Sequence, residues 1–138
     1  MPFQSLPDYE TFLYSLPEHG ATILTSTLVL VRRGAQMAIV SGEITFTSGH
    51  RLAVYEVLNT RYGFVRITNY GYEAWHGENL LYWYDSQPHP NNLDLAATHP
   101  HHKHVPPDIK HNRILAPGFS FMQPNLPLLI AEIEQLIQ

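Results

Sequence analysis

Apolar side chains recur at helical spacing at both ends of the chain. Near the start, Leu6, Tyr9, Leu13 and Leu16 lie three or four residues apart, which predicts a helix over Leu6–Leu16. Near the other end, Asn125 is a suitable cap for a second helix that continues to the last residue. The apolar stripe of this helix consists of Leu126, Leu129, Ile130, Ile133, Leu136 and Ile137, and Glu132, Glu134 and Gln135 are expected to face water.

The residues between these helices have the pattern of β-strands joined by short turns. Five strands are predicted: Ile23–Val31, Gln36–Thr47, Arg51–Asn59, Gly63–Trp75 and Leu80–Asp85. No connection is long enough for a βαβ crossover. The sequence therefore predicts an α+β fold, in which a short N-terminal helix and a C-terminal helix pack on a five-stranded antiparallel meander. Arg113–Leu115 is a candidate for a further short edge strand.

The composition fits a single domain spanning residues 1–138. Hydrophobic residues make up 44% of the chain and charged residues 14%, which excludes an intrinsically disordered protein. The net charge of −4 provides no general attraction for nucleic acid or an anionic membrane. The lack of cysteine excludes disulfides and thiol chemistry. Without a signal-like N-terminus or an apolar run of about 18–20 residues, we expect a cytoplasmic protein that does not enter a membrane.

Histidine is concentrated in one segment. Six of the nine histidines lie between His89 and His111. Prolines at positions 88, 90, 100, 106 and 107 oppose a regular helix or central strand there, so we expect a polar loop held between structured elements. The other three histidines (His19, His50 and His76) fall at predicted turns, and no function is expected of them.

Two kinds of chemistry are compatible with this segment. His102 and His104 could supply two nitrogen ligands to a metal ion, with Asp85 or His89 as a third. Alternatively, two imidazoles could act as base and acid on a phosphodiester, since the ordinary pKa of histidine is about 6.5. Lys103 would then stabilise the charge that develops on the phosphate. We prefer this metal-free interpretation because the segment is locally basic.

Less specific interpretations explain the same residues. The adjoining strands carry Tyr70, Tyr72, Tyr82, Tyr84, Trp75 and Trp83. Such strand aromatics form a core more often than a platform for stacked bases. A loop rich in histidine and proline is also a possible docking surface for a protein partner, or a structural loop whose imidazoles bond to backbone carbonyls.

Two motifs in this region resemble a known family. Tyr84-Asp85-Ser86-Gln87-Pro88-His89 is followed by Pro100-His101-His102-Lys103-His104. The pair resembles the TumE-like toxin family, the toxin half of a bacterial toxin–antitoxin pair, over roughly residues 51–138. That family has Tyr-Asp-Asn-Ala-Pro-His-His before Pro-His-His-Lys-His. Here Ser86 and Gln87 replace its Asn and Ala, and Pro90 replaces its second His, so an activity that needs that Asn or His would be lost.

The resemblance implies a cognate antitoxin protein as partner and suggests RNA as the target. We therefore expect a toxin with ribonuclease-like activity and no cofactor. The residues that would carry the activity are His89, His101, His102, His104, Lys103, Asp85 and Tyr84. The alternative is a non-catalytic regulatory module that docks a protein partner through its sheet and histidine-rich loop. The strand Ile23–Val31 has few charges and is a candidate surface for pairing two copies into a homodimer.

Overall fold

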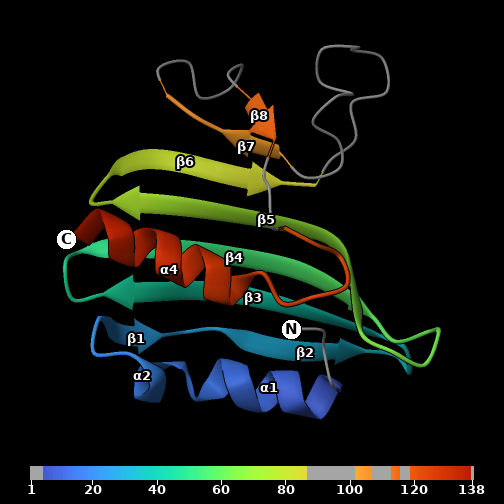
Figure 1. Cartoon of the computed structure of the whole chain (residues 1–138). Helices are drawn as coiled ribbons and strands as arrows, with labels where there is room; N and C mark the ends of the chain where they lie inside the picture. The colour runs from blue at the N-terminus through green and yellow to red at the C-terminus, as the bar shows by residue number, and fades with distance from the viewer. Residues whose placement is uncertain (1–4, 87–101, 107–112, 116–118, 138) are drawn as a thin grey trace.

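The computed structural model describes residues 5–86, 102–106, 113–115 and 119–137. It has an antiparallel sheet with helices from both ends of the chain packed on it (Figure 1). The helices are α1 (Leu6–Tyr14), α2 (Leu16–His19) and α4 (Leu126–Ile137). The strands are β1 (Ile23–Ser26), β2 (Val29–Arg33), β3 (Met37–Phe46), β4 (His50–Asn59), β5 (Arg66–His76), β6 (Asn79–Asp85), β7 (His102–His104) and β8 (Arg113–Leu115).

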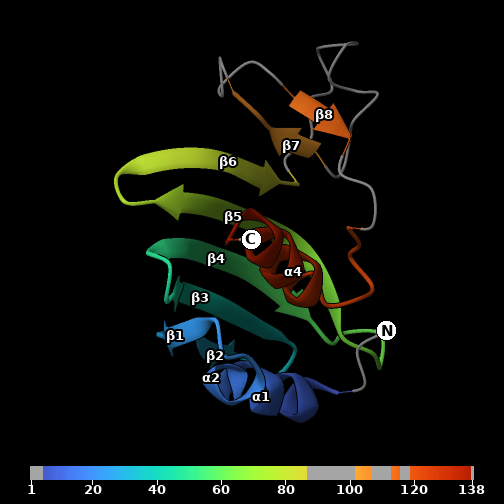
Figure 2. The same ribbon diagram turned by 60° about the vertical axis from the view of Figure 1, so that its left-hand side comes forward.

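All the described helices lie on one face of the sheet, and two views from different angles agree on this (Figures 1 and 2). The helix α1 begins where the Ser5 hydroxyl accepts a hydrogen bond from the Asp8 amide at 3.1 Å. Its buried Leu13 belongs to the same core as Leu129 and Ile133 of α4. We call this side of the sheet the helix face, and the opposite side the open face. The predicted α+β fold is confirmed.

The five-stranded meander is too small, because β3 to β6 continue into β7 and β8 and two strands precede β3. The predicted strand Ile23–Val31 is divided into β1 and β2, which pair with successive parts of β3. The break follows from Gly42, whose φ is 136°. A Cβ atom at Gly42 would lie 2.6 Å from the carbonyl oxygen of Thr27, so only glycine lets the chain pass so closely.

Three details of the C-terminal helix were predicted incorrectly. Asn125 occupies the cap position, since its carbonyl oxygen accepts a hydrogen bond from the Leu129 amide at 3.1 Å, but its side-chain Oδ1 accepts from the Ser120 amide at 2.9 Å instead of from the helix. Glu132 does not simply face water, because it binds Tyr84 and Lys103. Leu136 is largely exposed instead of packed in the core. Helical periodicity correctly predicted α4, but the contacts of the residues outside its buried stripe depend on the neighbouring strands and loops.

A buried carboxylate lies inside the core. Glu56 of β4 is fully buried and accepts hydrogen bonds from the hydroxyls of Tyr9 and Tyr72, each at 2.5 Å. The Tyr72 hydroxyl also accepts a bond from Asn125 Nδ2 at 3.3 Å. Burial raises the pKa of Glu56 above its ordinary value, although the two tyrosine hydroxyls oppose that shift. These bonds join α1, two central strands and the residue before α4.

Candidate functional site

The sheet brings the two halves of the histidine motif together. Tyr84 and Asp85 end β6, and β7 pairs with this end so that Tyr84 is opposite Lys103 and Asp85 is opposite His102. The predicted loop is therefore partly wrong, because His102–His104 form the strand β7. The predicted site residues His89 and His101 lie outside the described residues. Of His102, the backbone pairing alone is described.

On the open face, His104 is held by two residues of β6. Its ring stacks on Trp83, with centroids 4.0 Å apart and planes at 23°. Its Nε2 lies 3.1 Å from Asp85 Oδ2, and the same oxygen accepts a hydrogen bond from Trp83 Nε1 at 3.2 Å. His104 is only 2% exposed. The three side chains form a fixed unit, which we call the His104 triad.

On the helix face, Lys103 connects β7 to α4. Its Nζ lies 3.1 Å from Glu132 Oε2 and 4.2 Å from the centroid of the Tyr82 ring. The Tyr84 hydroxyl donates to the same carboxylate, at 2.7 Å from Oε2. Burial, followed by this bond to Glu132, raises the pKa of Tyr84 above its ordinary value of 10.0, so its hydroxyl remains a hydrogen-bond donor even at alkaline pH. The ammonium group of Lys103, which was predicted to stabilise charge on a phosphate, is thus paired with the carboxylate of Glu132 within the fold.

The candidate residues that the structure describes therefore lie on two sides of the sheet. His104 and Asp85 lie on the open face, whereas Lys103 and Tyr84 contact α4 on the helix face. The alternation of side chains along a strand causes this division. The tyrosines at positions 70, 72, 82 and 84 are all buried, which confirms that they are core residues.

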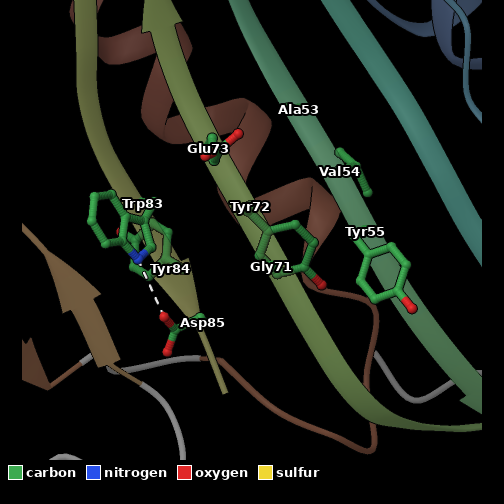
Figure 3. A pocket seen from close by; sticks show the side chains of 9 residues that line it. All are labelled: Ala53, Val54, Tyr55, Gly71, Tyr72, Glu73, Trp83, Tyr84 and Asp85. Carbon is green, nitrogen blue, oxygen red and sulfur yellow. Dashed lines mark hydrogen bonds between the residues drawn. The ribbon is translucent and has the colours of Figure 1, made fainter. Parts of the chain in front are cut away.

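Next to the His104 triad, the open face contains a hollow of about 300 Å³ (Figure 3). Gly71 of β5 forms its floor, between Tyr55 of β4 and Asp85 of β6, to which it is directly paired. Glu73 and Trp83 form a second pair beside it. A Cβ atom at Gly71 would meet nothing within 4 Å, so the missing side chain creates the space. We call this the Gly71 hollow.

The Gly71 hollow was not predicted from the sequence. The alternation along β6 could have placed Trp83 and Asp85 on one face. The alignment of Tyr55 with Gly71 could not be read from any one strand, because it depends on the register between strands. A glycine inside a strand was the available signal, since it often marks the close approach of a ligand.

No group of three or more histidine or acidic side chains in the described part of the chain is arranged to hold a metal ion. Two residues of the proposed ligand set, Asp85 and His104, are in contact, but His89 lies outside that part. The metal interpretation thus stays a prediction. His50 and His76, for which no function was expected, stack on each other with centroids 4.1 Å apart.

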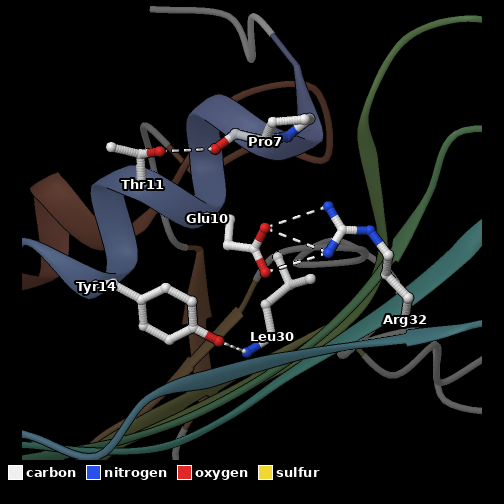
Figure 4. A network of polar contacts seen from close by, with 6 residues as sticks. All are labelled: Pro7, Glu10, Thr11, Tyr14, Leu30 and Arg32. Carbon is white, nitrogen blue, oxygen red and sulfur yellow. Dashed lines mark hydrogen bonds and ion pairs between the residues drawn. The ribbon is translucent and has the colours of Figure 1, made fainter.

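The outer edge of β2, which was predicted to pair two copies, is partly occupied by α1 (Figure 4). The Tyr14 hydroxyl accepts a hydrogen bond from the Leu30 amide at 3.0 Å. Beside it, Arg32 forms an ion pair with Glu10 at 3.2 Å. The bond to Tyr14 uses a backbone amide of β2 that a second copy would need, and the homodimer stays a prediction.

The described fold and site define a small α+β domain with a histidine–aspartate pair at one end of its open face. The chain belongs to the Toxin TumE family, whose family model matches residues 14–137. This match includes the first strands, which the resemblance of residues 51–138 did not cover. Searches of curated proteins and of solved structures found no match. Within the described residues, no helix has the length and apolar character to cross a membrane.

Proposed function

We propose that this chain is the toxin of a toxin–antitoxin pair and acts on RNA through its histidine-rich segment. Membership of the Toxin TumE family supports the first part and an antitoxin as partner. The contact between Asp85 and His104 supports the second part, because it holds β7, the strand that includes His102, against the end of β6. This contact lies at the end of β6, where the histidine-rich segment begins.

The proposal divides the motif into two roles. The His104 triad and the Lys103–Glu132 contact hold β7 against β6 and α4. The proposed acid and base are two of the three residues His89, His101 and His102, each contributing roughly 10²–10⁴ to the rate. His104 is a positioning residue in this scheme because its ring is buried against Trp83. The reaction needs no cofactor, since imidazoles can both accept and donate protons near neutral pH.

The test is growth of a bacterial culture that expresses the wild-type chain or a His101→Ala/His102→Ala variant. We expect the wild type to arrest growth and degrade RNA, and the double variant to do neither at the same level of soluble protein. His76→Ala is the matched control, because it removes an exposed histidine at the end of β5, outside the histidine-rich segment. Equal growth of wild-type and double-variant cultures would overturn the proposal, as would arrest with intact RNA for its RNA part.

One observation favours the second candidate, a non-catalytic module that docks a protein partner. Lys103 and His104, the two motif residues with described side chains in β7, are both engaged within the chain. If the motif is a docking surface, His101→Ala/His102→Ala will weaken binding of the partner protein in a pull-down assay without changing growth. Partner binding that survives this change excludes the module.

A further inference from the structure

The Gly71 hollow combines two aromatic side chains with two carboxylates. Tyr55, which is 43% exposed, and Trp83 provide the aromatic surface. Glu73 is exposed and has no ion-pair partner among the described residues, whereas Asp85 already binds Trp83 and His104. No lysine or arginine is among the described residues that line the hollow. A phosphate group would be repelled by these carboxylates, and a cation would be attracted.

Elsewhere on the open face, an indole ring and a carboxylate already bind a cationic side chain. The Arg51 guanidinium lies 4.6 Å from the centroid of the Trp75 ring and forms an ion pair with Glu43 at 3.2 Å. Trp83 and Glu73 are directly paired and offer the same two groups, an indole ring and a carboxylate, in the hollow. In the described part of the chain, no cation occupies this second pair.

We propose that the Gly71 hollow binds an arginine side chain from a basic segment of a protein partner. The guanidinium stacks on the aromatic wall and Glu73 accepts its hydrogen bonds, as Trp75 and Glu43 do for Arg51. Tyr55 and Asp85 are two strands apart, a separation of about 10 Å, which leaves room above Gly71 for one planar group. The net charge of −4 also favours a basic partner.

This inference takes from the proposed function only that a partner protein binds the chain. The hollow adjoins the His104 triad, since Trp83 and Asp85 belong to both. A partner segment with its arginine in the hollow would lie beside the end of β6, where the histidine-rich segment begins. Neutralisation of the toxin would then follow from occupation of neighbouring surface.

The test is an NMR titration of the ¹⁵N-labelled full chain with N-acetyl-arginine amide, following the Trp83 indole signal. We expect a saturable shift, and at least fivefold weaker binding of N-acetyl-citrulline amide, which has the same shape without the charge. Gly71→Val should abolish binding, because a Cβ atom at this position meets nothing within 4 Å and the branched side chain then occupies the floor of the hollow. Glu73→Gln should weaken binding several-fold. The matched controls are Thr45→Val and Glu78→Gln, which lie outside the hollow and should bind as the wild type does.

Three results would overturn the inference. One is the absence of a saturable shift up to about 10 mM, where an affinity in the millimolar range is measurable. Another is equal binding of the citrulline probe, which would show that charge is not recognised. The third is tighter binding of cytidine 5′-monophosphate at the same signals, which would make the hollow a nucleobase site. The titration does not depend on toxicity, so its failure is distinguishable from failure of the growth experiment.

Discussion

Lys103 and His104 are consecutive residues, yet their side chains lie on opposite faces of the sheet. Lys103 binds Glu132 of the helix α4, and His104 stacks on Trp83 on the open face. The Pro-His-His-Lys-His motif therefore includes two residues that hold β7 in place, one on each face of the sheet. Substitutions of Lys103 and of His104 should therefore have separate effects, because the two side chains share no partner.

We expect His104→Ala to lower the free energy of unfolding by about 2–3 kcal/mol. The change removes a buried ring from its stack on Trp83 and leaves Asp85 without that contact. Urea unfolding measures the effect, with Gln135→Ala on the exposed side of α4 as a control that should change stability by less than about 0.5 kcal/mol. Unchanged stability together with lost growth arrest would show that His104 acts in catalysis and not in positioning.

The contact between Lys103 and Glu132 should show measurable coupling. In a double-mutant cycle of Lys103→Met and Glu132→Gln, we expect a coupling energy of about 0.5–1 kcal/mol. Methionine keeps most of the apolar stem near the Tyr82 ring, so the cycle reports mainly on the charge. Thermal unfolding in low and high salt is the measurement. A coupling energy of zero at low salt would mean that the ion pair does not hold β7 on α4.

The buried Glu56 should make stability depend on pH. Burial raises its pKa above the ordinary value of 4.5. Below pH 4.5 the carboxyl is protonated in both states, and above it the unfolded chain loses the proton while the folded chain keeps it. Stability from this group is therefore full at low pH and is lost as the pH rises through the folded-state pKa.

Urea unfolding between pH 4 and 8 can measure this loss against a Glu56→Gln variant, which has no titrating group at this position. The wild type should lose stability relative to the variant as the pH rises. A difference between the two proteins that stays constant across this range would show that the Glu56 pKa is the same in both states.

Two glycines of the sheet should respond oppositely to alanine. Gly42→Ala places a Cβ atom 2.6 Å from the Thr27 carbonyl oxygen at a φ of 136°, so we expect a loss of about 2 kcal/mol or more. Gly71→Ala meets no atom within 4 Å and should be neutral or slightly stabilising. Melting temperatures measured by circular dichroism compare the two. A neutral Gly42→Ala would mean that β1 and β2 can separate from β3 there at no cost.

The sequence was sufficient to predict the strands β3 to β6, the helices α1 and α4 and the α+β class, but not the break at Ser15 that separates α2 from α1. These features come from local patterns: alternation along each strand, helical spacing in Leu129 and Ile133, and turn residues between elements. The motif that ends at His104 was likewise sufficient to suggest the family. Both kinds of signal are contained within short stretches, so neither needs knowledge of distant neighbours.

Tertiary structure alone decided how the candidate residues are grouped. Register places Trp83 opposite His104 and Gly71 between Tyr55 and Asp85, and a shift of one residue would send each side chain to the other face. Two further features depend on contacts between distant residues. Glu56 is buried between Tyr9 and Tyr72, and the predicted first strand is divided where Thr27 passes close to Gly42 of β3. The periodicity of a sequence shows which residues share a face of one strand, but it does not show which strand lies beside it. The candidate site of this protein depends on which strands are neighbours.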